Sequence, residues 1–191
     1  MGSLLVLGCS SGAGDQSGTG GADVASFVEQ VSVAVEAAGS GGASDDQLAI
    51  LREAQTSGEL TFDQARQAAL ATIDCIEVGG GSASYYEQRE PSGLVVPGSI
   101  LEAKDEEGLT RMEPVLDECV NLESFWVNKV YQLQPDSQEV RDAYVAKQAP
   151  AIRRCLEDNG YATDPEATPR DLVSRAFDVS RETNNAVNCY G

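Results

Sequence analysis

Carboxylates are the only abundant side chains in this sequence that could act as general acids or bases. The 191 residues include 31 Asp and Glu but no His, which excludes Ser–His–Asp and Cys–His nucleophiles and His-containing zinc sites. Two acidic groups stand out: the pair Asp117 and Glu118, and the run Asp105, Glu106 and Glu107. A glycosidase needs two acids on opposite sides of a cleft, and adjacency in sequence does not supply that arrangement. We therefore expect no catalysis; an extracellular carboxylate-dependent hydrolase is the alternative.

The net charge of −18 restricts the partners of the protein. Nucleic-acid binding needs a basic face for phosphate contacts, and electrostatic binding to anionic lipid needs one too, so we expect neither. The acyl-transfer motif Ser-x-x-Lys, the P-loop, the dinucleotide-binding glycine motif and the EF-hand loop are all absent from the sequence. The acidic run 105–107 lacks the ligand spacing of a dedicated calcium site. We expect neither a cofactor nor a metal ion.

One of the five cysteines follows a short apolar run. Residues 4–9 read LLVLGC, and residues 10–22 are rich in Gly and Ser. The first stretch resembles a bacterial lipobox, where a small residue precedes a cysteine that becomes lipidated, and the second is typical of a flexible tether. We expect residues 1–9 to be a truncated signal segment whose true start lies upstream. Lipidated Cys9 would then anchor the protein to the outer face of the cytoplasmic membrane. A cytosolic helical protein with a stray cysteine is the alternative.

The other four cysteines are an even number, which in an exported chain favours two disulfides. No Cys-x-x-Cys pair occurs, so redox catalysis and a zinc knuckle are both disfavoured. Among three connectivities we favour Cys75–Cys119 and Cys155–Cys189, because each pair can meet where successive helical segments double back. In the chain-entropy model, closing loops of this length contributes about 4 kcal/mol each.

Aromatic residues provide the candidates for binding. Tyr85 and Tyr86 are adjacent on an expected strand, so one ring faces away from the core. An exposed tyrosine beside a Gly-rich turn can stack on a sugar or contact a protein partner. The alternative is that the two rings pack the two sides of the hairpin. Trp126 lies on the apolar stripe of a helix, where we expect it to be part of the core.

The apolar periodicity predicts a mainly α fold, a disulfide-tied bundle of five to six helices with one small β-hairpin at about residues 83–101. Ser44, Thr61 and Asp136 are each followed three residues later by Gln or Glu, which predicts three capping boxes. The expected helices cover about residues 23–38, 45–57, 62–76, 109–130, 136–158 and 168–177. We assign residues 23–191 to a single helical domain.

Two elements have features of their own. The helix from Asp136 to Gly160 is expected to be the hub of the fold, with its stripe from Val140 to Leu156 facing the core and a kink at Pro150. In the hairpin, the second strand is expected to be short or irregular because Pro97 and Gly98 follow its first residues.

The lipobox-like start, the tether, the paired cysteines and the stretches 58–61 (GELT) and 155–161 (CLEDNGY) resemble small exported lipoproteins of high-GC Gram-positive bacteria. The resemblance implies an envelope location and a disulfide-tied helical domain, but no activity. The sequence therefore predicts a lipid-anchored envelope protein with a binding or scaffolding role. Its expected partners are the membrane, through Cys9, and an envelope protein or glycan.

Overall fold

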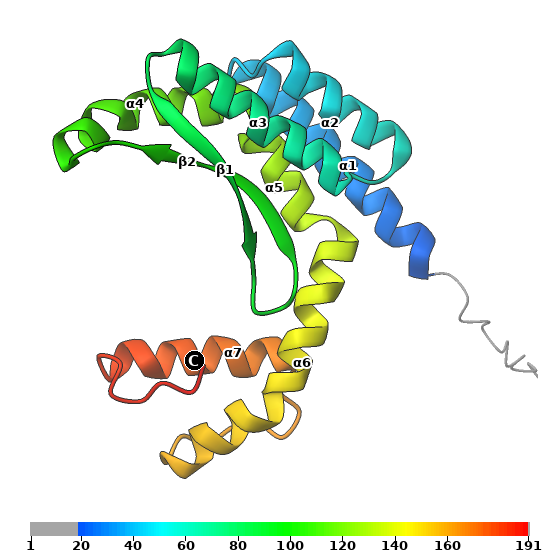
Figure 1. Ribbon diagram of the computed structural model, residues 1–191. Coiled ribbons are helices and arrows are strands. Elements are labelled where there is room, and N and C mark those ends of the chain that lie inside the picture. Colours follow the sequence, from blue (N-terminus) through cyan, green and yellow to red (C-terminus); the bar gives the residue numbers. More distant parts are fainter. Residues whose placement is uncertain (1–18, 191) are drawn as a thin grey trace, which may run out of the picture.

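The computed structural model describes residues 19–190 and is mainly helical (Figure 1). Within this range there are seven helices and one antiparallel hairpin, so the predicted fold class is confirmed. The predictions for Cys9 and for the rest of residues 1–18 lie outside the described residues. The elements are α1 Thr19–Ser40, α2 Asp45–Ser57, α3 Phe62–Val78, β1 Ser82–Arg89, β2 Val95–Glu102, α4 Glu106–Glu123, α5 Phe125–Leu133, α6 Pro135–Asp158 and α7 Pro169–Glu182.

Two helices begin with caps made by residues close in sequence. At α3, Thr61 Oγ1 accepts a hydrogen bond from Gln64 N at 3.2 Å, and Gln64 Oε1 accepts one from Thr61 N at 2.8 Å. This is the predicted capping box, which satisfies two first-turn N–H groups. At α7, Thr168 is the N-cap and Pro169 lies in the first turn, again as expected. These motifs need only residues within one turn of each other.

The Gln47 side chain joins α2 to the junction between α4 and α5. Ser44 is the N-cap of α2, but the predicted capping box is wrong, because the Ser44 N–H donates to Leu122 O and not to Gln47. Gln47 Nε2 donates to Asn121 O and Leu122 O at 3.1 and 2.6 Å, and its Oε1 accepts from Trp126 N at 2.7 Å. One buried amide thus satisfies the last carbonyls of α4 and a first-turn N–H of α5, groups that have no partner within their own helices.

The helix expected over residues 109–130 is two helices. α4 begins at Glu106, where Asp105 Oδ1 accepts from Gly108 N at 2.8 Å, so it starts before the predicted position. It ends at Glu123, and the Oγ of the C-cap residue Ser124 accepts a hydrogen bond from the buried Thr72 hydroxyl at 2.8 Å. Polar partners from α2 and α3 are therefore available where the helix is interrupted. The single-helix prediction is wrong, and α5 takes its own direction (Figure 1).

Gln134, the residue directly after α5, forms hydrogen bonds that hold the C-terminal end of this helix. Gln134 Oε1 accepts from Leu60 N and Gln134 Nε2 donates to Leu60 O, both at 2.9 Å. Gln134 also occupies the N-cap position of α6, and Pro135 is the first helical residue. The predicted capping box between Asp136 and Glu139 is therefore wrong, because Asp136 already lies inside the helix.

The second strand of the hairpin is longer than predicted. β1 and β2 pair along their full length, with Glu87 opposite Pro97. Pro97 is fully buried inside β2, and the strand continues beyond Gly98 to Glu102. Both strands of a two-stranded sheet are edge strands, where a residue without an N–H is tolerated. The expectation that Pro97 and Gly98 end the strand is wrong.

The described helices enclose two separate apolar cores. The larger core lies among α1, α2, α3, α5 and the hairpin and includes the fully buried Phe27, Leu51 and Leu60. The smaller core lies between the C-terminal half of α6 and α7, around Leu156 and Val179. Among the described elements, α7 packs on α6 alone.

Helix α6 connects these two cores. Ser137 at its start and Ile152 and Leu156 near its end are buried, but residues 138–148 include no buried side chain. Val140 is 39% exposed, so the expected continuous core stripe, and with it the role of a hub, is wrong for the middle of the helix. The helix continues through Pro150 without a break, and the kink expected there stays a prediction. Figure 1 shows it leading away from the larger core toward α7.

Both favoured disulfides are present. Cys75 in α3 is bonded to Cys119 in α4, and Cys155 in α6 is bonded to Cys189 after α7, with Cα–Cα distances of 5.6 Å in each pair. The second disulfide holds the C-terminal tail against the smaller core. Because disulfides persist in oxidising compartments, the two pairs indicate an extracytoplasmic environment. Between residues 19 and 190, no helix combines the length and apolarity needed to cross a membrane.

Candidate functional site

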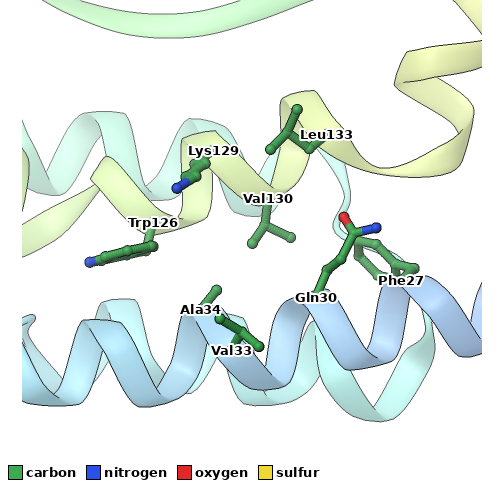
Figure 2. Close-up of a pocket in the computed structure, with 8 residues that line it drawn as sticks. All are labelled: Phe27, Gln30, Val33, Ala34, Trp126, Lys129, Val130 and Leu133. Carbon is green, nitrogen blue, oxygen red and sulfur yellow. The ribbon is translucent and has the colours of Figure 1, made fainter.

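An apolar groove of about 240 Å³ lies between α1 and α5 (Figure 2). Its lining is apolar except for one amide and one ammonium group. Figure 2 shows Ala34 and Val130 pointing toward each other across the space between the two helices. The lining residues are Phe27, Gln30, Val33 and Ala34 of α1 and Trp126, Lys129, Val130 and Leu133 of α5.

The groove has a buried floor and exposed walls. Ala34 and Val130 are only 4% and 6% exposed, whereas Val33 and Leu133 are 63% and 46% exposed. Because Ala34 ends at a methyl group, the space above it is not filled by its own side chain. Burial of large aliphatic side chains such as Val33 and Leu133 under a ligand would be favourable, because it removes apolar surface from water. Exposed apolar surface gathered around a hollow is typical of binding sites.

Trp126 forms the aromatic wall of the groove. Its backbone N–H donates to Gln47 Oε1, so α2 fixes the first turn from which the indole projects. The indole meets the Phe125 ring edge-to-face, with centroids 5.0 Å apart. The helical stripe predicts Trp126 in the core, but the side chain is only partly buried and lies between the core and the groove. Helical periodicity does not distinguish these two environments.

Lys129 gives the groove its only positive charge. The lining contains no carboxylate, although the chain carries 31 acidic residues. Lys129 Nζ lies 4.9 Å from the centroid of the Trp126 ring, a cation–π contact. Among the side chains of residues 27–190, no carboxylate forms an ion pair with Lys129. The groove therefore combines an apolar slot with one cation at its edge.

The tyrosines predicted as binding residues lie on β1, and neither lines this groove. The Tyr86 ring covers Gly98 on the paired strand, where a Cβ would lie 2.8 Å from ring carbons. The Tyr85 hydroxyl donates to Glu87 Oε1 at 3.1 Å. Desolvation, followed by this hydrogen bond to a carboxylate, raises the pKa of Tyr85. Both rings have packing or bonding roles within the hairpin, and a role in binding stays a prediction.

The acidic residues considered as catalysts occupy helix ends or exposed positions. Asp105 caps α4, and Glu106 and Glu107 lie in its first turn, where negative charge interacts favourably with the helix dipole. Asp117 and Glu118 are both exposed on α4. In the described part of the chain, no three or more Asp, Glu, Cys or His residues are grouped so that they could hold a metal ion. Helix capping and solvation account for the positions of these acids.

An ion pair joins the hairpin tip to the exposed middle of α6. Arg141 Nε and Nη2 donate to the two carboxylate oxygens of Glu90 at 3.0 and 2.6 Å, and Arg141 Nη1 donates to Gln132 O at 2.6 Å. The hydrogen bonds from Arg141 hold the pKa of Glu90 below its ordinary value, although burial acts in the opposite direction. A second hollow nearby has Pro91 of the tip and Tyr144 of α6 in its lining. The ion pair therefore fixes how the hairpin meets α6.

The chain matches no protein-family model, no curated protein and no solved structure.

We predict that Glu90→Gln lowers the free energy of unfolding by about 1–2 kcal/mol at pH 7, because it replaces a charge-assisted, two-bond contact. The folded state lowers the pKa of Glu90, so the stabilisation is complete above the unfolded-state pKa and is lost as the pH falls through the folded-state pKa. The difference between the two proteins should therefore shrink at acidic pH. Urea unfolding at pH 7 and at about pH 3 measures it.

Glu139→Gln is the matched control, because it makes the same change at an exposed position on α6 and should alter stability by less than about 0.5 kcal/mol. Equal stability of wild type and Glu90→Gln at pH 7 would contradict the prediction. A difference that persists unchanged at acidic pH would contradict it too.

Proposed function

We propose that this chain is a lipid-anchored extracytoplasmic protein that binds an apolar ligand in the groove between α1 and α5 and carries out no catalysis. The observation that carries the proposal is the exposed apolar lining of this groove, with Val33 and Leu133 in water on either side of a buried floor. The resemblance to exported lipoproteins and the two disulfides support the location.

The composition of the groove supports binding. Ligand sites are lined mainly by apolar and aromatic side chains with a few polar groups that orient the ligand. Here Trp126 provides the aromatic surface, and Lys129 and Gln30 are the polar groups. Tryptophan is also among the residues that contribute most to binding energy when a partner covers them.

The position of the groove supports a link to the membrane. α1 is the first described helix, and its groove residues begin at Phe27. Cys9 precedes Thr19 by ten residues, so covalent geometry limits the distance between the two residues to at most about 35 Å. A lipid on Cys9 would keep the groove close to the membrane surface, where apolar ligands are concentrated.

The anchor is tested by expressing the full chain and its Cys9→Ala variant, preceded by a functional export signal, in a Gram-positive host. We expect the unmodified protein in the membrane fraction and the variant in the medium, because only the former can receive a lipid. Ser10→Ala is the control and should stay with the membrane. Equal release of the unmodified and Cys9→Ala proteins would refute the anchor.

Groove binding is tested with 1-naphthylamine, a neutral apolar fluorophore of ten carbon atoms that matches the size of the groove. We expect Ala34→Leu to weaken its binding at least tenfold, because the larger side chain fills the space above the floor. Val33→Asp should weaken it similarly, because a ligand in the groove would desolvate the new carboxylate. Fluorescence titration of the full chain measures both affinities, and circular dichroism verifies that each variant is folded.

Ala146→Leu is the control, since it makes the same substitution on the exposed middle of α6 and should leave the affinity unchanged. If both groove variants fold and bind the fluorophore as tightly as the wild type, the groove is not the binding site.

A further inference from the structure

We propose that the ligand of the groove is a single-chain amphiphile with an anionic headgroup, of the fatty-acid class. Its chain lies between Ala34 and Val130, and its headgroup meets Lys129 at the edge. The inference rests on the proposed function, because it specifies the occupant of the same groove.

The size of the groove limits the ligand to one chain. An apolar cavity of about 150 Å³ binds benzene, so in proportion the groove volume of about 240 Å³ accommodates roughly ten carbon atoms. Drug-sized ligands occupy pockets of about 300–1,000 Å³, and the two chains of a phospholipid need more apolar space than the groove offers. The space lies between two helices that run side by side, which suits a linear chain (Figure 2).

The charge of the groove selects the headgroup. The protein has a net charge of −18 and only three lysines, yet one of these lysines lines the groove and no carboxylate does. The exposed carboxylates Glu29 and Glu36 lie on α1 outside the lining. An anionic headgroup would form a charge-assisted hydrogen bond with Lys129. A neutral headgroup can accept a hydrogen bond from the ammonium but forms no ion pair with it, and a cationic headgroup is repelled by it.

The indole of Trp126 links these two features. The ring forms part of the apolar wall, and Lys129 Nζ lies over it at 4.9 Å from the ring centroid. A cation held over an aromatic face keeps its other side available to an anion. The headgroup and the first carbons of the chain would therefore be bound by neighbouring residues one turn apart on α5.

Trp126 is the only tryptophan of the chain, so its fluorescence reports occupancy of the groove. The full chain is titrated with decanoate and decyltrimethylammonium below their micellar concentrations, and with decanol below its solubility limit. A salt concentration of 0.15 M limits the range of more distant charges to roughly 8 Å. We expect decanoate to bind about fivefold more tightly than the other two, the size of one favourable exposed charge pair. The overall negative charge of the protein works against this order, so the order would reflect the local cation.

Lys129→Gln should weaken decanoate binding about fivefold and leave decanol binding unchanged. Lys147→Gln is the matched control, because it removes the same charge from the exposed middle of α6. It should change neither affinity. Isothermal titration calorimetry provides the same affinities for Lys129→Gln independently of the indole, whose environment that substitution alters.

The outcomes separate this inference from the proposed function. Equal affinities for the three amphiphiles, or equal effects of the two lysine substitutions, would overturn the anionic headgroup while the groove remained a binding site. Failure of all three to bind would overturn the inference, and failure of the neutral fluorophore as well would overturn the proposed function. Binding to anionic phospholipid vesicles without any response to decanoate would also overturn it, since the occupant would then be a bilayer.

Discussion

The position of α5 depends on the amide of one buried side chain. Gln47 is 1% exposed and bonds at once to the carbonyls that end α4 and to the N–H of Trp126 in the first turn of α5. Helix ends carry backbone groups without intrahelical partners, and leaving such groups buried and unpaired costs about 1–3 kcal/mol each. The interruption at Ser124 is tolerated because α2 supplies these partners and α3 supplies the Thr72 hydroxyl. The interruption then frees the nine residues of α5 to follow α1.

The groove and the two-core arrangement both follow from this placement. Because α5 lies beside α1, Val33 and Leu133 remain exposed and Trp126 becomes a wall of the groove. At the other end of α5, the paired hydrogen bonds between Gln134 and Leu60 fix where α6 departs from the larger core. After the start of α6, the ion pair of Arg141 with Glu90 joins the exposed stretch of this helix to the hairpin. The buried side chains of Gln47 and Gln134 thus position α5 and the start of α6, the segment that lies between the two disulfides.

The sequence predicts what depends on local physics and misses what depends on distant partners. Residues 44–47 and 61–64 have the same spacing of a hydroxyl residue and Gln, yet only Thr61 and Gln64 form the capping box. Gln47 forms no capping box with Ser44, because backbone groups at two helix ends, more than 70 residues away, bond to the Gln47 amide instead. The disulfide pairs and the hairpin could be anticipated from cysteine number and strand pattern. The groove could not, because an apolar helical stripe looks the same whether another helix or solvent covers it; the lone Lys129 beside Trp126 is the one local signal.

The claim that Gln47 builds this site is tested most directly by amide hydrogen exchange at Trp126. A first-turn N–H has no helical acceptor and normally exchanges fast, but here it donates to Gln47 Oε1 at 2.7 Å. The Trp126 amide should therefore be protected in the wild type. It should exchange rapidly in Gln47→Ala and stay protected in Gln67→Ala, a control at an exposed position on α3. A Trp126 amide that exchanges rapidly in the wild type, or stays equally protected without Gln47, would contradict the account.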